Sequence, residues 1–336
     1  MLQRWTCLVV CLLASVQAVR AEQKNLLTVA PDGSGDFKTV QAAVDAVPEN
    51  NASRVTIQIK PGTYKERITV PATKPFVTFR ADDAATTVLT FDLSATDPGP
   101  DGKPLGTFGS YSTMIAGRDF IAENITFENS SGNHGQALAM AATGDRLVFR
   151  KCRFLGWQDT LYANGGRQYY ADCYIAGRVD FIFGNATAVF DGCEIHSRNG
   201  GHVTAASTPQ DHPFGYVFLN CKLTGDAIPW TAPAATQPDK LTPQADLGRP
   251  WRPYGAVAYI NCEMGNHIKP EGWNNWGKAE NEKTARFSEY ESKGPGANRE
   301  KRFAWSKQLT DDEAATYTLK NILSGTDNWD PNAQQQ

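Results

Sequence analysis

The segment Tyr170-Ala171-Asp172-Cys173-Tyr174-Ile175 decides the fold, because similar segments recur along the 336-residue chain. In each one an apolar, strand-like run precedes a cysteine, and an apolar residue follows two positions later. The other copies are Val148-Phe149-Arg150-Lys151-Cys152-Arg153-Phe154, Val189-Phe190-Asp191-Gly192-Cys193-Glu194-Ile195, Val217-Phe218-Leu219-Asn220-Cys221-Lys222-Leu223 and Ala258-Tyr259-Ile260-Asn261-Cys262-Glu263-Met264. Residues 121–127 form an earlier copy with Ile125 at the cysteine position.

The spacing of these copies indicates a solenoid. The first three cysteines are 21 and 20 residues apart, and the later gaps of 28 and 41 residues fit the same unit with inserted loops. Short alternating strands and the near absence of helical periodicity between residues 50 and 270 predict an all-β, single-stranded parallel β-helix. In that fold the cysteines are stacked interior side chains, although a disulfide between neighbouring coils remains an alternative.

Both ends of the solenoid need covers, because a bare terminal coil exposes its core and its sheet edge. Apolar residues at helical spacing predict a short capping helix over 39–47, which Pro48 ends. Near the other end, the capping box of Thr310 and Glu313 predicts a helix that turns Leu319, Ile322 and Leu323 inward and ends at Gly325. Residues 94–109 and 225–248 are rich in proline, glycine and polar residues, so we expect long loops that wall a groove on one face.

Composition bounds the compartment and the partners. Residues 1–21 resemble a secretory signal peptide, with Arg4, an apolar run and small residues at Ala18 and Ala21, which leaves 22–336 as a single domain. We therefore expect a secreted monomer, or a periplasmic one in a Gram-negative bacterium. A net charge of −3 favours neither nucleic acid nor an anionic membrane as a partner, and no later segment is apolar enough to span a bilayer.

A set of polar residues repeats at one interval and indicates chemistry. Gln136, Gln158 and Asp180 are each 22 residues apart, so in a solenoid they should line up along one face at about 4.8 Å per coil. Asp159 lies beside this row, and Arg249 comes from a later coil. Because Asp180 lies within the apolar run 179–183, its carboxylate needs a partner or a task.

These residue types suffice for acyl transfer without a serine or a metal. One carboxylate has to stay ionised to attack an ester, and a hydrogen-bonded arginine favours that form. The other has to hold a proton for the leaving alcohol, which burial and a charged neighbour would promote. Glutamine N–H groups can stabilise the oxyanion.

Five segments in order resemble the signature blocks of the pectin methylesterases, or pectinesterases, over roughly residues 27–325. They are Gly62-Thr63-Tyr64-Lys65-Glu66, Gln136-Ala137-Leu138-Ala139, Gln158-Asp159-Thr160-Leu161-Tyr162, Asp180-Phe181-Ile182-Phe183-Gly184 and Gly248-Arg249-Pro250-Trp251. The resemblance implies a right-handed parallel β-helix that removes methyl groups from the C6 esters of polygalacturonate, with no cofactor and no metal. One block has Ala-Leu-Ala-Met where that family more often has Ala-Val-Ala-Leu, an exchange among apolar residues.

The resemblance also implies a role for each site residue. Asp180 would be the nucleophile and Asp159 the general acid and then base. Gln136 and Gln158 would stabilise the oxyanion, and Arg249 would orient Asp180. The sugar-binding cleft would be lined by Trp251, Phe181 and Tyr162.

Other interpretations stay open at this point. Asp180 could be a structural carboxylate paired with Arg178 or Arg249, and Trp251 could pack under a loop. A lyase would need a calcium-binding carboxylate cluster, which the sequence lacks, and a glycosidase would leave the glutamines idle. The same carboxylates acting on a different ester, or a non-catalytic pectin-binding homologue, are the remaining alternatives. The five histidines show no ligand spacing, and His134 alone is near a site residue in sequence.

Overall fold

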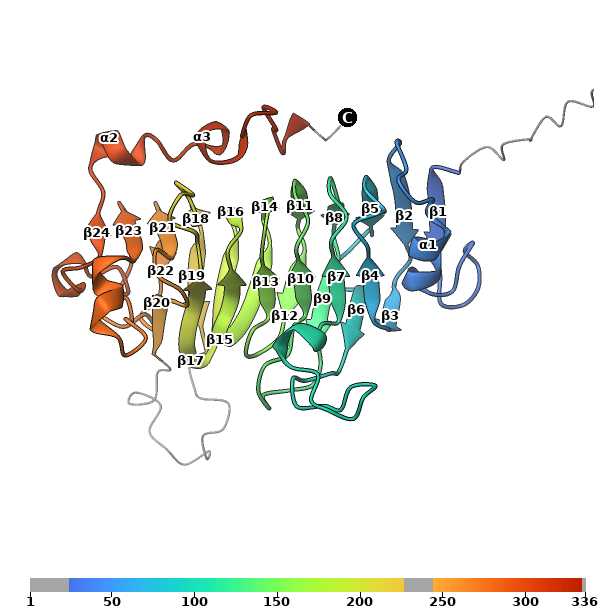
Figure 1. Ribbon diagram of the computed structural model, residues 1–336, viewed down its shortest axis with the longest axis horizontal. Coiled ribbons are helices and arrows are strands. Elements are labelled where there is room, and N and C mark those ends of the chain that lie inside the picture. Colours follow the sequence, from blue (N-terminus) through green and yellow to red (C-terminus); the bar gives the residue numbers. More distant parts are fainter. Residues whose placement is uncertain (1–23, 227–243, 334–336) are drawn as a thin grey trace, which may run out of the picture.

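The computed structural model describes residues 24–226 and 244–333. The predicted signal peptide at 1–21 and most of the predicted loop at 225–248 therefore lie outside the described residues. The described chain forms a right-handed parallel β-helix, as predicted, whose strands stack into two long sheets (Figure 1). None of the helices in the described ranges is long and apolar enough to cross a membrane.

Apart from the terminal coils, each coil contributes one strand to an 11-stranded sheet and one or two to a 13-stranded sheet, and the named strands pair in parallel. The first sheet contains β1 (Leu26–Val29), β2 (Val55–Ile59), β5 (Val77–Arg80), β8 (Ile121–Glu123), β11 (Leu147–Arg150), β14 (Arg167–Ala171), β16 (Thr187–Asp191), β18 (Tyr216–Leu219), β21 (Ala256–Ile260), β23 (Arg286–Tyr290) and β24 (Lys307–Gln308). The second contains β3 (Gly62–Lys65), β4 (Ile68–Val70), β6 (Thr87–Phe91), β7 (Thr113–Ile115), β9 (Thr126–Asn129), β10 (Met140–Ala142), β12 (Arg153–Leu155), β13 (Leu161–Ala163), β15 (Tyr174–Gly184), β17 (Glu194–Ala206), β19 (Lys222–Gly225), β20 (Ala245–Pro250) and β22 (Glu263–Met264). The helical elements are α1 (Val40–Ala46), α2 (Asp311–Ala314), α3 (Leu319–Leu323) and the 3₁₀ turns η1 (Thr107–Gly109), η3 (Ala279–Lys283) and η4 (Arg299–Lys301).

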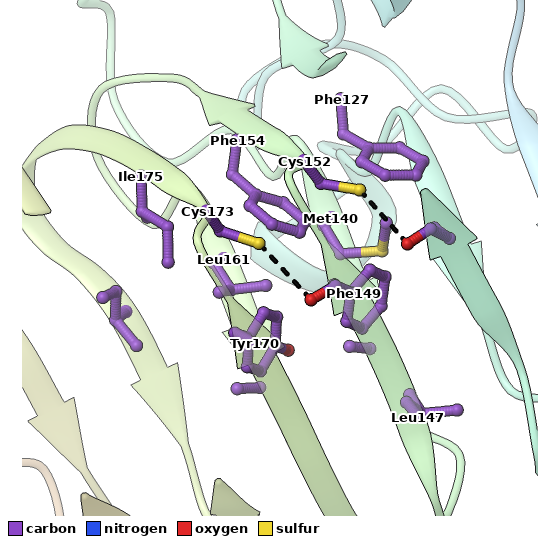
Figure 2. Close-up of a cluster of buried hydrophobic side chains, with 14 of the residues drawn as sticks. Phe127, Met140, Leu147, Phe149, Cys152, Phe154, Leu161, Tyr170, Cys173 and Ile175 are labelled. Atoms are coloured by element: carbon purple, nitrogen blue, oxygen red, sulfur yellow. Dashed lines mark hydrogen bonds between the residues drawn. The ribbon is translucent and has the colours of Figure 1, made fainter. Parts of the chain in front are cut away.

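The recurring cysteine frame is the bend between the two sheets. The residue before each cysteine, or before Ile125, has a positive φ, which reverses the chain locally and which glycine, asparagine and aspartate tolerate best. These residues are Asn124, Lys151, Asp172, Gly192, Asn220 and Asn261, with φ between 51° and 62°. The cysteine then enters the core, and in Figure 2 the thiols of Cys152 and Cys173 point at carbonyls of the preceding coil. All five cysteines in the described ranges are buried and unpaired, which confirms the interior role.

Aromatic rings stack at the coil repeat and fill the interior. Phe149, Tyr170, Phe190, Phe218 and Tyr259 form one ladder with consecutive centroids 4.5 to 4.9 Å apart. This distance equals the spacing of neighbouring strands, so each ring rests flat on the ring of the next coil. Burying one such ring contributes about 1.5–3 kcal/mol, which makes this ladder a main source of stability.

The predicted amino-terminal cap is α1, which packs against β1, β2 and β4. The carboxylate of Glu66 accepts hydrogen bonds from the first backbone N–H groups of α1 at 2.8 and 2.9 Å, which suits the positive end of the helix dipole. Lys74 donates to the carbonyls of Val44 and Asp45 at the other end, both at 2.8 Å. Glu66 is therefore structural.

The carboxy-terminal helices differ from the single predicted helix. The capping box of Thr310 and Glu313 is present, but α2 ends at Ala314, and α3 begins anew after its own cap, Thr318. The chain runs back along the outer face of the 11-stranded sheet in Figure 1, where Ile322 and Leu323 join an apolar cluster. These helices therefore cover the side of the solenoid, because that sheet has an apolar outer face as well as an apolar inner one.

Candidate active site

Asp159 and Asp180 lie on adjacent coils. Asp159 is at the turn that leads into β13, and Asp180 is within β15. Both have positive φ, 64° and 52°, and both are 7% exposed. Leu161 pairs with Ile182, and the same register leads back to Asp159 opposite Asp180; the Asp159 N–H donates to the Val179 carbonyl at 3.0 Å. The predicted row is thus correct for Gln136 and Gln158, which form a parallel bridge, but wrong for Asp180, whose partner is Asp159. The left-handed backbone shifts the register by one, which spacing alone does not reveal.

A bidentate pair of hydrogen bonds from one arginine holds the carboxylate of Asp180. Nε and Nη2 of Arg249, on β20, donate to Oδ1 and Oδ2 of Asp180 at 2.8 and 2.7 Å. The guanidinium carbon of Arg249 lies 3.7 Å from the ring centroid of Trp276, which covers the flat face of the arginine. Arg178, the other candidate partner, forms no ion pair within the described ranges. This geometry fixes the orientation of the Asp180 carboxylate beside a cation.

Asp159 is electrostatically different. Burial raises its pKa from 3.8 to about 8, with a further contribution from the negative charge of Asp180, while Arg249 acts in the opposite direction. The two neighbouring carboxyl groups thus have opposite preferences at neutral pH. Asp159 holds a proton, and Asp180 is paired with a cation. Such a division is typical of acid–base catalysis.

Gln136 and Gln158 provide the remaining polar groups. Neither side-chain amide hydrogen-bonds to another residue of the described chain, and both line a cavity of about 260 Å³ together with Asp159, Asp180 and Arg249. The cavity is otherwise lined by Thr107, Phe108, Phe183, Ala205, Trp251 and Trp276. The free N–H groups can therefore be directed at a ligand atom beside the two carboxyl groups.

The aromatic walls of the cavity correct one prediction. Phe181 is fully buried in the core, where it packs so closely that a Cβ on Gly177 would lie 2.2 Å from its own Cβ, so it does not reach the cleft. Phe183 lines the cavity instead and meets Trp251 edge to face, with ring centroids 5.8 Å apart. Tyr162 stacks on Phe183 at 4.7 Å, beside the cavity. Because φ of Asp180 is positive, Phe181 and Ile182 both face the core. The residues after Asp180 therefore do not alternate between core and surface as they do in a regular strand.

The comparison with protein families decides the identity. A sequence model described as Pectinesterase matches residues 26–326. The chain belongs to the pectinesterase family. It is 44% identical to pectinesterase 31 of Arabidopsis thaliana over 305 residues, which cover 89% of this chain and 92% of that protein.

Solved pectin methylesterases have the same fold. The structure of the carrot pectin methylesterase has a TM-score of 0.81 at 32% identity, covering 90% of this chain and 93% of its own. Pectin methylesterase PemA of Erwinia chrysanthemi has a TM-score of 0.77 at 30% identity, covering 93% and 99%. One solved pectin methylesterase is a complex with a hexasaccharide.

Several residues of this pectinesterase site were not apparent from the sequence. Trp276 lies on an irregular segment between β22 and η3, at φ 62°, and its backbone N–H donates to Oδ1 of Asn274 at 2.7 Å. Phe108 belongs to the predicted loop 94–109 and packs against Tyr162 with the rings tilted and their centroids 5.0 Å apart, so the loop does wall the cavity. Loop composition alone could not indicate which of its residues reach the site. His134 is exposed and away from the cavity lining, and the described residues contain no group of three or more potential metal ligands.

Proposed function

We propose that this protein hydrolyses the C6 methyl esters of polygalacturonate through a covalent intermediate on Asp180, releasing methanol and leaving free carboxylates. The observation that carries the proposal is one cavity in which an arginine-bound Asp180, an Asp159 of raised pKa and two unpartnered glutamine amides converge. Family membership supports the ester and the polymer.

In the first step an oxygen of Asp180 attacks the ester carbonyl carbon. The pair of hydrogen bonds from Arg249 keeps this carboxylate oriented and ionised before attack. The N–H groups of Gln136 and Gln158 stabilise the oxyanion of the tetrahedral intermediate, and the loss of one such donor costs about 3 kcal/mol in comparable sites. The proton of Asp159 passes to the departing methoxide, which leaves as methanol.

In the second step Asp159, now ionised, removes a proton from water. The hydroxide formed attacks the acyl carbon of the anhydride between Asp180 and the sugar acid, and the C–O bond to Asp180 breaks. The product carboxylic acid and the ionised Asp180 result, the acid loses its proton to solvent, and Asp159 again holds a proton. The same residue thus serves as acid and then as base.

The walls of the cleft and the environment of the protein complete the proposal. Trp251 and Tyr162 offer apolar ring faces, against which the uncharged faces of the sugar rings can pack. Residues 22–336 would act as a single secreted domain after removal of 1–21, as a monomer.

The test is methanol release from highly methylated pectin, with and without EDTA. Release that EDTA does not change supports the proposal, because the chemistry uses only carboxyl, amide and guanidinium groups. Release of acetate from acetylated pectin without methanol release would instead indicate a different ester. Binding of pectin by a folded protein that releases neither product would indicate a non-catalytic role.

A further inference from the structure

A row of outward-facing residues extends from the active site toward the amino-terminal coils. At one register position across seven strands lie Thr69, Met114, Ala141, Tyr162, Phe183, Ala205 and Arg249. Figure 1 shows four of these strands, β4, β7, β10 and β13, side by side. The residues between its ends all belong to one apolar cluster, in which Ala141, Phe183 and Ala205 are buried and Met114 and Tyr162 are half-buried. We call this row, with the cluster packed on it, the floor, because a polymer of sugar rings can lie over it along the axis of the solenoid.

Arg67 lies at the far end of this floor, directly before β4. Its guanidinium carbon is 4.1 Å from the ring centroid of Tyr111, and Nη2 donates to the carbonyl of Gly109 at 2.9 Å. Tyr111 packs against the same apolar cluster as Trp251 and Trp276. Arg67 is therefore fixed in place by groups that belong to the floor and to the loop at 94–109.

The charge of Arg67 has no counterpart in the structure. Within the described ranges no acidic side chain lies within ion-pair distance of it, and its Nε is buried without a hydrogen-bond partner. The neighbouring carboxylate of Glu66 is bound at the start of α1. By contrast, Arg249 at the other end of the row is paired with Asp180. A partly buried, stacked and immobilised guanidinium without an anion is suited to bind one, and a planar carboxylate matches its geometry.

We propose that Arg67 binds the free carboxylate of an already demethylated galacturonate unit while a methylated unit of the same chain occupies the active site. This proposal rests on the proposed function, which supplies the polymer. Arg67 comes directly before β4, and Asp159 comes just before β13. Because β4, β7, β10 and β13 are consecutive in the sheet, three inter-strand distances, about 14 Å along the solenoid axis, separate the two residues. A polymer lying on the floor would therefore reach Arg67 a few sugar units away from the reacting ester, and carboxylates made by earlier turnovers would become ligands.

A binding measurement tests Arg67 without using activity. The probe is an unmethylated oligogalacturonate hexamer, titrated calorimetrically into the wild-type protein, Arg67→Gln and Arg153→Gln. Arg153 is the matched control, because it also lies over a tyrosine ring, Tyr174 at 5.3 Å, but its strand β12 pairs with β9 and with residues 174–176 at the start of β15, away from the row that contains Phe183. We expect Arg67→Gln to weaken binding about five- to tenfold at low salt and by less at 0.5 M NaCl, and Arg153→Gln to leave it unchanged.

The kinetic test separates recognition of a carboxylate from support of the loop. The ratio of kcat/KM for partly demethylated pectin to kcat/KM for fully methylated pectin should fall about fivefold in Arg67→Gln, with Arg67→Lys intermediate. An equal loss on both polymers would mean that Arg67 only holds the loop through Gly109, and unchanged hexamer binding would also overturn the proposal. A wild-type protein that released no methanol would refute the proposed esterase function, and hexamer binding would still decide the role of Arg67.

Discussion

Replacement of Arg249 by lysine is the most demanding test of the geometry around Asp180, because it preserves the charge. The arginine donates two hydrogen bonds to the two carboxylate oxygens and presents its flat face to Trp276. A lysine ammonium can keep one of these bonds but has neither the fork nor the flat face. The loss of one charge-assisted bond costs about 1.5–3 kcal/mol, and the loss of the ring contact about 0.5–2 kcal/mol.

Together these losses, about 2–5 kcal/mol, predict a decrease in kcat/KM of roughly 30- to 4,000-fold, at about 1.4 kcal/mol for each factor of ten. The assay is methanol release from highly methylated pectin, with thermal unfolding to check that the variant folds. Arg252→Lys is the control, since Arg252 also lies over a tryptophan, Trp251 at 4.7 Å, but pairs with no carboxylate in the described ranges. Activity of Arg249→Lys within threefold of the wild type would refute the reasoning.

Three further outcomes follow from the structure. The kcat of the wild type should fall as pH rises through about 8, because the proton that Asp159 donates is lost there, and a flat pH–rate profile up to pH 10 would contradict this. Asp159→Asn should lower kcat at least 100-fold with a much smaller change in KM, measured by initial rates, because an amide cannot donate the proton; a loss confined to KM would exclude this role. Phe181→Ala should destabilise the fold by about 3–5 kcal/mol in urea unfolding, because this ring is buried in the core. Trp251→Ala should raise KM with little loss of stability, because this ring lines the cavity. The reverse result would mean that Phe181, and not Trp251, contacts the substrate.

The repeat of short strands and cysteines was enough to predict the β-helix. The repeating unit needs a left-handed bend followed by a small interior residue, so the same short sequence pattern recurs from coil to coil, as Asp172 and Cys173 illustrate. The carboxy-terminal helices were less predictable. Local capping signals indicate where a helix begins, but the apolar outer face that α3 covers is formed by strands far away in sequence.

The polar residues that line the cavity were easier to predict than their register. The interval between Gln136 and Gln158 matched their bridge, although the strands that follow, β10 and β13, pair at an offset of 21 residues, as Met140 and Leu161 show. Asp180 broke the pattern, since its positive φ changes which neighbours face inward, and Phe181 was misplaced for the same reason. Trp276 had no periodic signal, because it comes from an irregular segment that only the folded chain brings to Arg249.

The most direct test of the central claim is the rate of methanol release from highly methylated pectin by Asp180→Asn, compared with the wild type at neutral pH. An asparagine at this position retains the size of the side chain but cannot form the acyl intermediate with the sugar acid. If Asp180 is the nucleophile, turnover should fall below the detection limit while thermal unfolding and pectin binding stay close to those of the wild type. A folded variant that retains more than a few per cent of wild-type activity would contradict the account.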